Sequence, residues 1–326
     1  MKELEEIAQV TGSFLPDFIK KYQEVLTSND PLIDQALSKI KSGRGKHIRP
    51  ILLALVVKLL GHEITSSEVD AAVLLELLHC ASLIHDDVID LSPLRRGEPT
   101  LNSIYGNHIS VLVGDYILAK CFHLAVRNCS QSIMEVVALA GMYLSTGELH
   151  QAKATQGLQV ITEKEYFNII QKKTGTLFEA TTQIGTLCAK SSMEDRSKLA
   201  NLGRLLGLAF QIKDDIFDFY DDPKKGKPAG LDMAEGKFTL PLIYTFYSAE
   251  NALQKEVKIL LEQAQTSLEA RKKLVKLAHD SGGLNYAQEK LEEILHQAEA
   301  IIHEFSPSPA QEALLKLCDF LYFRSF

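Results

Sequence analysis

Two aspartate clusters are the residues of this sequence whose types and spacing best suit chemistry. Both have the pattern Asp-Asp-x-x-Asp, and their members are Asp86, Asp87, Asp90, Asp214, Asp215 and Asp218. On a helix, the first and last aspartate of this pattern share a face, and their carboxylates repel one another unless a cation binds. Magnesium fits because it takes a few carboxylates and fills its other positions with water and substrate phosphate oxygens. The six aspartates therefore predict a magnesium-dependent diphosphate site.

A solvated acidic helix end is the other explanation for an aspartate cluster. For one cluster it is serious, because chance gives roughly one match per twenty chains of average composition. Two matches in one chain are much harder to explain in this way. Apolar residues lead into both clusters, and these are Leu83, Ile84, Phe210 and Ile212. We therefore expect the clusters at the mouth of the core, where a functional role is favoured.

Basic residues that could hold a diphosphate lie in separate segments. Four of them are Lys46, Arg49, Arg95 and Arg96. Arginine suits this role because its planar guanidinium recognises phosphate oxygens in a bidentate manner. His79 lies two helical turns before Asp86 and would share its face. A lone helical histidine is more often structural, so its spacing alone leaves both interpretations open.

Further polar residues occur downstream. The triplet Lys173-Thr174-Gly175 joins a cation, a hydroxyl and a helix-weakening glycine, which could turn an oxygen toward a developing positive charge. Gln211 lies one turn before Asp214 and could offer its amide oxygen, although a glutamine at the core edge is an equally good explanation. Lys227 and Lys237 could close over a phosphate, with ordinary surface lysines as the alternative.

Composition restricts the class of protein. The 326 residues carry 35 basic and 42 acidic side chains, a formal charge of −7, and no basic tail, which makes nucleic acid an unsuitable partner. The five cysteines include no C-x-x-C pair, which favours a reducing compartment over disulfides or zinc. The acidic start, Met1 to Glu6, is unlike a secretory peptide, so we expect the mature protein to begin there. Without an uncharged apolar run of membrane-spanning length, we expect a cytoplasmic protein, at most peripheral to a membrane.

Long helices are expected to position these groups. No proline lies between Pro99 and Pro223, so this stretch lacks the commonest helix breaker. Pro50 suits a first helical residue, and the apolar pattern after it predicts a core helix that ends at Gly61. Thr65-Ser66-Ser67-Glu68 has capping-box spacing and predicts a helix that runs to about Asp90.

A second long apolar pattern, residues 205–219, predicts a helix that ends in the second aspartate cluster. Gly203 and Gly207 lie one turn apart and predict close helix packing. Polar loops follow both clusters, at 92–100 and 221–230, and no alternating strand pattern is present. We therefore predict one all-α domain over residues 1–326.

Together these segments resemble the trans-prenyltransferases, the polyprenyl diphosphate synthase family. The most specific stretches are GKHIRP (45–50), HDDVIDLSPLRRGEPT (85–100), VGD (113–115), KTG (173–175), FQIKDDIFD (210–218) and GKPAGLDMAEGKFTLP (226–241). The resemblance implies the isoprenoid-synthase fold, an antiparallel helical bundle around a deep central cavity, and usually a homodimer. It also implies head-to-tail condensation of isopentenyl diphosphate with an allylic diphosphate, assisted by three magnesium ions.

The same resemblance implies a role for each matching residue. Isopentenyl diphosphate would be held by Lys46, Arg49, His79 and Arg96. The allylic diphosphate would be held by Arg95, Lys173, Lys227 and Lys237. Thr174 and Gln211 would lie beside the allylic cation, and the catalytic set would be Asp86, Asp90, Lys173, Thr174, Gln211 and Asp214. The proton lost at the end would pass to the released diphosphate, because no protein base is evident.

Small residues before the first cluster predict a long product. Ala81 and Ser82 lie about one turn below Asp86, so neither would block a hydrocarbon tail. From Asp86 to Ser67 the helix descends roughly 28 Å at about 1.5 Å per residue, room for several isoprene units beyond a farnesyl chain. We favour a product of about 35 to 40 carbons. Candidates for the cavity floor are Phe122, His123 and Met142. By family resemblance the product would be a quinone side-chain precursor, released through peripheral membrane contact.

Three other functions remain to be weighed. A terpene cyclase would share the fold but binds one diphosphate, so a second basic set argues against it. A shorter-chain synthase, making farnesyl or geranylgeranyl diphosphate, would differ only in its cavity. A non-catalytic subunit of a heteromeric synthase would be expected to lose aspartates or basic residues, whereas both clusters here are intact.

Overall fold

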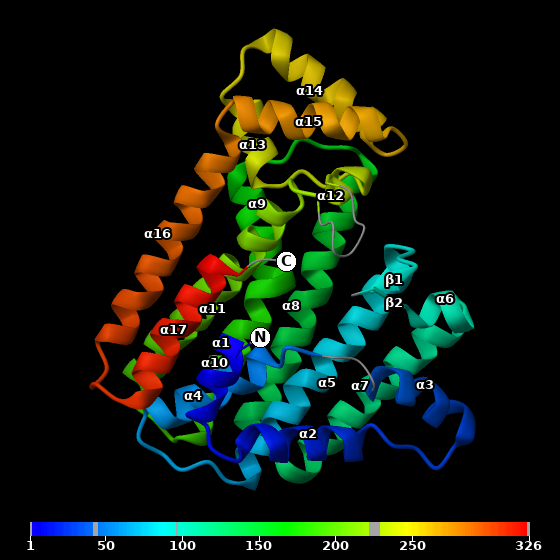
Figure 1. The fold of residues 1–326 in the computed structure, drawn as a ribbon. Coiled ribbons are helices and arrows are strands. Elements are labelled where there is room, and N and C mark those ends of the chain that lie inside the picture. The colour runs from blue at the N-terminus through cyan, green and yellow to red at the C-terminus, as the bar shows by residue number, and fades with distance from the viewer. Residues whose placement is uncertain (1, 42–44, 96, 222–228, 325–326) are drawn as a thin grey trace. The chain divides into compact units, whose positions relative to one another are not determined.

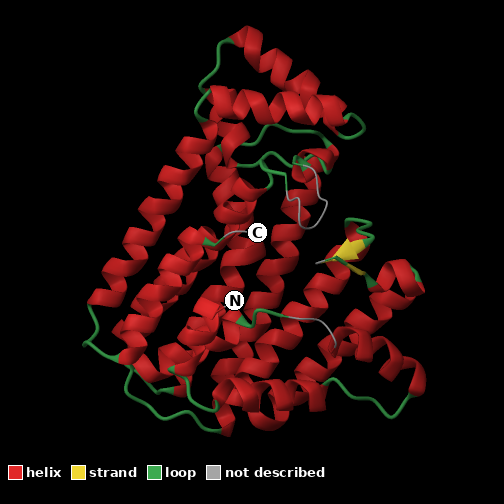
Figure 2. Cartoon of the chain, in the orientation of Figure 1, coloured by secondary structure: helices red, strands yellow, loops and turns green. Residues whose placement is uncertain are grey.

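The described chain is almost entirely helical, as Figures 1 and 2 show. The computed structural model describes residues 2–41, 45–95, 97–221 and 229–324. Its helices are α1 (Lys2–Gln9), α2 (Phe14–Val25), α3 (Pro31–Lys41), α4 (Ile48–Leu59), α5 (Ser66–Ile89), α6 (Leu101–Tyr105), α7 (Asn107–Asn128), α8 (Gln131–Gln156), α9 (Glu163–Ile170), the π-helical turn η1 (Gln171–Gly175), α10 (Thr176–Cys188), α11 (Met193–Phe217), α12 (Leu231–Ala234), α13 (Leu240–Tyr247), α14 (Asn251–Ala264), α15 (Leu268–Asp280), α16 (Gly283–His303) and α17 (Pro309–Phe323). The all-α prediction is confirmed.

A small hairpin follows the first aspartate cluster. Strands β1 (Leu94–Arg95) and β2 (Glu98–Pro99) pair antiparallel. Gly97 in the turn has a φ of +81°, which glycine adopts without strain. The sequence predicted only a loop here, because strands of two residues show no alternation.

One compact unit of the chain comprises Met1–Gly141, Leu177–Gly203 and Ile301–Leu317. Its central helix α5 packs against α2, α4, α6 and α7, and Figure 1 shows α5 and α7 side by side. Helix α4 is apolar on all sides, and its residues 51–57 are fully buried. A helix with this pattern belongs inside a core, as the sequence predicted for the segment after Pro50.

The second compact unit comprises Met142–Thr176, Arg204–Ala300 and Cys318–Phe326. Within it α13 packs against α9, α14 and α15, and α14 lies alongside α15. The chain passes between the two units several times, so neither unit is one continuous segment. The assignment of residues 1–326 to one domain stays a prediction.

Helix α5 begins and ends where the sequence predicted. The backbone N–H of Thr65 donates to Glu68 Oε2 over 2.7 Å, and the Thr65 hydroxyl accepts from Ser67 N over 3.2 Å, as in a capping box. Asp90 is the C-terminal cap. Helix α4, in contrast, begins at Ile48, two residues before Pro50.

Helix α11 is longer than its apolar pattern indicated. It begins at Met193, and the close packing predicted at Gly203 is confirmed. A Cβ at this glycine would lie 2.4 Å from Thr182 Oγ1 and 2.5 Å from Phe178 O, both on α10. Only glycine therefore allows α10 and α11 to approach this closely.

Candidate active site

The first aspartate cluster occupies the C-terminal end of α5. Asp87 is buried, and its Oδ1 accepts hydrogen bonds from Arg95 Nε over 2.9 Å and Arg95 Nη2 over 2.8 Å. Asp86 and Asp90 are partly exposed. Negative charge at this end of a helix is unfavourable, because the helix dipole is already negative there. A bound cation would offset the repulsion.

Gly114, in the VGD stretch (113–115) of α7, lies close to the helix that carries the first cluster. A Cβ at Gly114 on α7 would lie 2.2 Å from Nε2 of His85 on α5. The His85 Nε2 atom is also 3.5 Å from Asp115 Oδ1. Gly114 thus lets α7 approach α5 directly behind the first cluster.

Two of the predicted basic residues gather around an acidic residue that the sequence analysis missed, Glu76. His47 Nδ1 lies 3.6 Å from Glu76 Oε1. Burial raises the pKa of Glu76, but the nearby His47 imidazole and the charges of His79 and Arg49 outweigh it and lower the pKa to about 2. The Arg49 guanidinium lies 5.0 Å from the ring centroid of Phe178. The structure therefore brings Arg49 and His79 to one side of α5, while Lys46 is exposed.

The second aspartate cluster is held by hydrogen bonds on α11. Asp215 is buried, and its two oxygens accept from the Tyr166 hydroxyl over 2.7 Å and from Gln211 Nε2 over 2.8 Å. The oxygens of Asp218 accept backbone N–H groups at the start of α12, from residues 231 and 232, over 2.9 and 3.1 Å. The cluster thus meets α12 through its last carboxylate.

A pocket of about 120 Å³ lies beside this cluster in the second unit. Its polar lining includes Tyr166, Lys173, Gln211, Asp215, Asp232 and Lys237. Lys173 Nζ lies 2.7 Å from Glu148 Oε2, and Lys237 Nζ lies 3.8 Å from Asp232 Oδ1. The pocket therefore gathers two of the predicted lysines, Lys173 and Lys237, with the predicted glutamine and one predicted aspartate.

The KTG triplet forms an irregular helical turn next to this pocket. Residues 171–175 are π-helical, and the Thr174 hydroxyl donates to Gln211 Oε1 over 2.6 Å. A Cβ at Gly147 on α8 would lie 2.9 Å from Lys173 N. A larger residue at position 147 would therefore clash with the backbone of this turn. Single π-turns of this kind are frequent at functional sites. The irregularity expected from the triplet is confirmed.

Magnesium fits these donors. Within the described part of the chain, no three His, Cys, Asp or Glu side chains converge into a complete metal site. Magnesium is usually held by one or two carboxylates together with waters and substrate phosphates, so it needs no such cage. Carboxylates beside separate sets of basic residues are what a magnesium diphosphate complex requires.

Comparison with known proteins decides the family. The family model described as polyprenyl synthetase matches residues 30–278, most of the chain. This chain belongs to the polyprenyl synthetase family. The trans-prenyltransferase class of enzyme and the isoprenoid-synthase fold, both implied by the sequence resemblance, are confirmed.

Relatives of this polyprenyl synthetase differ in the product that their names state. The octaprenyl diphosphate synthase of Escherichia coli (strain K12) is 34% identical over 315 residues, which cover 96% of this chain and 97% of that protein. The short chain isoprenyl diphosphate synthase of Methanothermobacter thermautotrophicus is 31% identical over 322 residues, which cover 94% and 97%. A crystal structure of polyprenyl synthase from Caulobacter crescentus CB15, complexed with calcium and isoprenyl diphosphate, matches with a TM-score of 0.91 at 28% identity and covers 98% of both chains.

Two residues near the second cluster were missed by the sequence analysis of this synthetase. Asp232 adds a carboxylate whose charge acts on both Asp215 and Asp218. Arg324, near the C-terminus, is buried, and its Nη2 lies 2.7 Å from Asp214 Oδ1. Its guanidinium also lies 4.1 Å from the ring centroid of Phe210 on α11.

Some sequence predictions fall outside the structure or stay untested by it. Arg96 and Lys227 lie outside the described residues. The proposed floor residues Phe122 and Met142 are 59% and 66% exposed, and His123 is exposed too. None of these side chains is enclosed within a single chain, so the floor assignments stay predictions.

The metal-free synthetase is expected to become less stable as the pH rises from about 6 to 8. Burial is the main cause that raises the pKa of Asp215 and Asp218 to about 8, and the charge of Asp232 adds to it. The ordinary pKa of an aspartate is 3.8, so between pH 3.8 and about pH 8 the folded chain binds more protons than the unfolded chain. Stability therefore falls with rising pH in this window. Thermal unfolding in a chelator at pH 6 and pH 8 measures the fall.

Asp232→Asn provides the matched variant for this measurement. It removes the nearby charge and should make the unfolding midpoint less dependent on pH. An equal midpoint at pH 6 and pH 8 in the unmodified protein would contradict the assignment. Glu76 does not interfere, because its lowered pKa affects stability only at more acidic pH.

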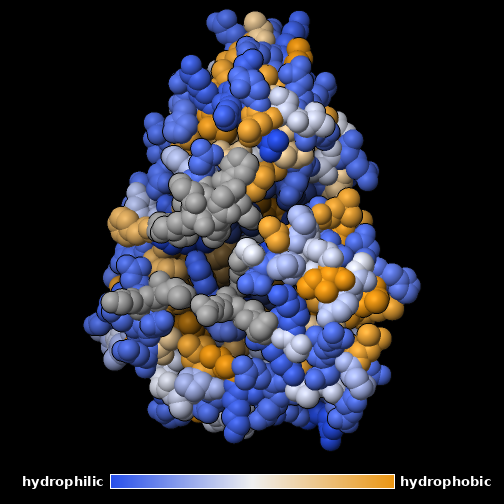
Figure 3. All heavy atoms as spheres, turned by 45° about the vertical axis from the view of Figure 1, so that its right-hand side comes forward, coloured by the Kyte–Doolittle hydropathy of each residue, from blue (hydrophilic) through white to orange (hydrophobic). Residues whose placement is uncertain are grey.

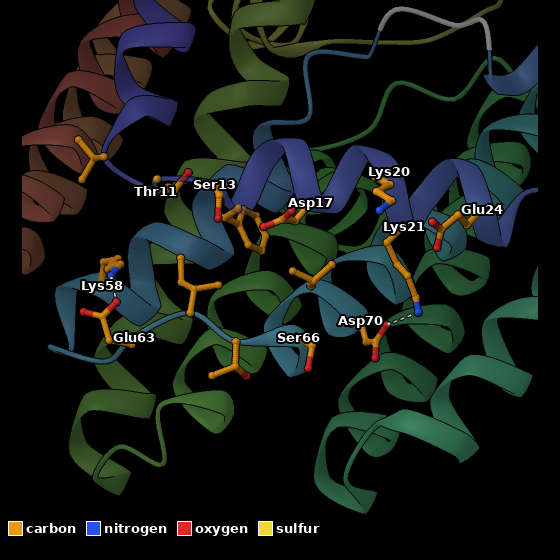
Figure 4. A pocket seen from close by; sticks show the side chains of 16 residues that line it. Thr11, Ser13, Asp17, Lys20, Lys21, Glu24, Lys58, Glu63, Ser66 and Asp70 are labelled. Atoms are coloured by element: carbon orange, nitrogen blue, oxygen red, sulfur yellow. Dashed lines mark hydrogen bonds and ion pairs between the residues drawn. The ribbon is translucent and has the colours of Figure 1, made fainter.

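A larger groove, of about 550 Å³, lies in the first unit between α2 and the segment that joins α4 to α5 (Figure 4). Four of its charged side chains form two ion pairs, Lys21 with Asp70 at 3.5 Å and Lys58 with Glu63 at 2.6 Å. Asp70 and Asp86 are separated by about 24 Å along α5 at 1.5 Å per residue. We therefore assign no part of the active site to this groove.

Proposed function

We propose that this polyprenyl synthetase joins isopentenyl diphosphate head-to-tail to an allylic diphosphate and extends it to an all-trans chain of about 35 to 40 carbons. The observation that carries the proposal is the pairing of each aspartate cluster with its own basic residues. Arg95 accompanies the first cluster, and Lys173 and Lys237 accompany the second. Arg49 and His79 form a separate set that suits a second diphosphate.

The aspartates and lysines would hold the allylic diphosphate. Bound magnesium, three ions in our proposal, would neutralise its oxygens as the negative charge grows. Asp86, Asp90, Asp214 and Asp218 would supply ligand oxygens. Asp87 and Asp215 belong to the same proposed set of ligands, and each is buried and also accepts two hydrogen bonds from neighbouring side chains.

Side chains of the protein would then assist cleavage of the allylic C–O bond and formation of the new C–C bond. The allylic C–O bond breaks, and its electron pair leaves with the diphosphate, which Arg95, Lys173, Lys227 and Lys237 retain. Thr174 and Gln211 would place oxygen atoms beside the resulting cation. The double bond of isopentenyl diphosphate, held by Lys46, Arg49, His79 and Arg96, attacks the cation and forms the new C–C bond. A proton then passes to the released diphosphate.

Metal dependence tests this proposal directly. Purified protein treated with a chelator should not incorporate labelled isopentenyl diphosphate into an organic-soluble product. Addition of magnesium should restore incorporation, and an allylic primer should be required. Equal incorporation in chelator and in magnesium would contradict the proposal.

Replacement of Lys46 or Arg49 by alanine is expected to raise the KM for isopentenyl diphosphate about tenfold or more. Each change would remove a ground-state contact to the diphosphate. The KM for the allylic diphosphate should change much less, because a different basic set holds that substrate. Steady-state kinetics with each substrate varied in turn measures both constants. A larger rise in the allylic KM would show that the basic residues are wrongly divided.

We propose that the enzyme is a cytoplasmic homodimer whose interface includes α7. Helix α7 is long and apolar enough, by length and composition, to cross a membrane, but core helices of soluble proteins pass the same test. Its exposed face carries Leu112, Phe122 and Val126, and apolar side chains stand at the surface in Figure 3. A second copy of the chain would cover this exposed apolar face. Contact with a membrane would then be peripheral and would serve product release. Sedimentation of a monomer would contradict the dimer.

A further inference from the structure

Four side chains form a continuous hydrogen-bonded series beside the pocket of the second unit. Thr174 Oγ1 donates to Gln211 Oε1 over 2.6 Å, and Gln211 Nε2 donates to Asp215 Oδ1 over 2.8 Å. The Tyr166 hydroxyl donates to Asp215 Oδ2 over 2.7 Å. Tyr166 and Asp215 are both buried. The proposed function assigns roles to three of these residues and none to Tyr166.

The series determines which way the Gln211 amide points. When Asp215 is ionised, as bound cations favour, its oxygens only accept hydrogen bonds, so the amide nitrogen faces Asp215 and the amide oxygen faces Thr174. The Thr174 hydroxyl hydrogen is then used in the bond to Gln211. The lone pairs of the Thr174 oxygen remain available to a neighbouring cation. An amide turned the other way would instead present its N–H groups to Thr174.

Tyr166 is placed to maintain this orientation. It comes from α9, which continues directly into the π-helical turn that carries Thr174, whereas Gln211 and Asp215 lie one turn apart on α11. The tyrosine hydroxyl satisfies the Asp215 oxygen that Gln211 does not use. A buried carboxylate oxygen without a donor is costly, so this bond discourages Asp215 from turning away from Gln211.

We propose that Tyr166 is a positioning residue that, through Asp215 and Gln211, directs the Thr174 oxygen toward the allylic cation. This inference rests on the proposed function, because it assigns Thr174 to the cation. Tyr166 itself lines the pocket but acts through the other three residues. It would therefore affect the chemical step more than the binding of either substrate.

Tyr166→Phe tests the inference. The variant should lower kcat about tenfold, while the KM of each substrate changes less than about twofold. The matched control is Tyr286→Phe, because the Tyr286 hydroxyl donates over 2.8 Å to Glu163, a carboxylate on the same helix α9. This control loosens α9 but leaves the series intact, so it should keep normal kcat. Equal losses in both variants would overturn the inference in favour of simple loosening.

A double-mutant cycle separates positioning from stability. If Tyr166 acts through Thr174, Tyr166→Phe should have little further effect on kcat in a Thr174→Val background. Independent, multiplying effects of the two changes would overturn the proposal. The activity of the unmodified enzyme tests the proposed function separately.

A crystal structure of Tyr166→Phe gives a readout that needs no activity. We expect the Gln211 amide to be turned or displaced and its contact with Thr174 to be lost. An unchanged series from Thr174 to Asp215 would overturn the inference even if the enzyme were inactive for another reason.

Discussion

Asp86→Ala is expected to reduce turnover about a thousandfold or more while the fold is retained. Diphosphate departure concentrates negative charge that side-chain cations alone do not balance, and Asp86 is proposed to hold one of the metals that do so. Asp86 is partly exposed at a helix C-terminus, where loss of a negative charge does not harm the helix. Steady-state turnover with saturating magnesium, together with thermal unfolding, measures both effects.

In the second cluster, a more conservative substitution than alanine is needed. Asp214 pairs with the buried Arg324, so alanine there would leave a buried guanidinium without its partner. Asp214→Asn keeps an acceptor for Arg324 and should still reduce turnover by orders of magnitude. Asp280→Ala is the control, because Asp280 is an exposed carboxylate at the end of α15. Near-normal turnover in folded Asp86→Ala or Asp214→Asn would contradict the metal assignment.

Ala81→Phe is expected to shorten the product to about fifteen to twenty carbons while turnover of the first condensation persists. In the proposed route, a growing tail anchored at Asp86 passes this position, one turn lower on α5 at about 1.5 Å per residue. A phenyl ring there would stop elongation below the reacting carbons. Chromatographic sizing of labelled products from the variant and from the unmodified enzyme measures the change.

The structure adds a second position for this experiment. Ala81 is fully buried, so a larger side chain there could cost about 1 to 3 kcal/mol of stability by overpacking. Ser82 is partly exposed, and its hydroxyl donates to His79 O over 2.9 Å. Ser82→Phe therefore meets less packing strain and serves as the matched variant. Unchanged products in both active variants would show that the tail takes another route, and a short product in the unmodified enzyme would favour the shorter-chain alternative.

Local signals explain what the sequence predicted correctly. The capping box at Thr65, the acidic end of α5 at Asp90 and the close packing at Gly203 depend on neighbouring residues or on helical spacing. Both clusters were recognisable for the same reason, because their members lie within one turn. The start of α11 was missed because its first two turns are polar and carry no apolar stripe.

Long-range partners could not be predicted in this way. Tyr166 is 49 residues from Asp215, and Arg324 is far along the chain from Asp214, so no local pattern joins them. Glu76 was not identified because an acid on an apolar helix has no periodic signature, although its place one turn before His79 and Cys80 was a usable signal. Asp232 lay within the quoted family motif and could have been singled out there.

The size of the labelled product tests the central claim most directly. Purified protein, magnesium, labelled isopentenyl diphosphate and allylic primers of several lengths should give an organic-soluble all-trans prenyl diphosphate of about 35 to 40 carbons. The same mixture with Asp86→Ala should give almost none. Absence of any prenyl chain longer than the primer, from folded unmodified protein, would contradict the account.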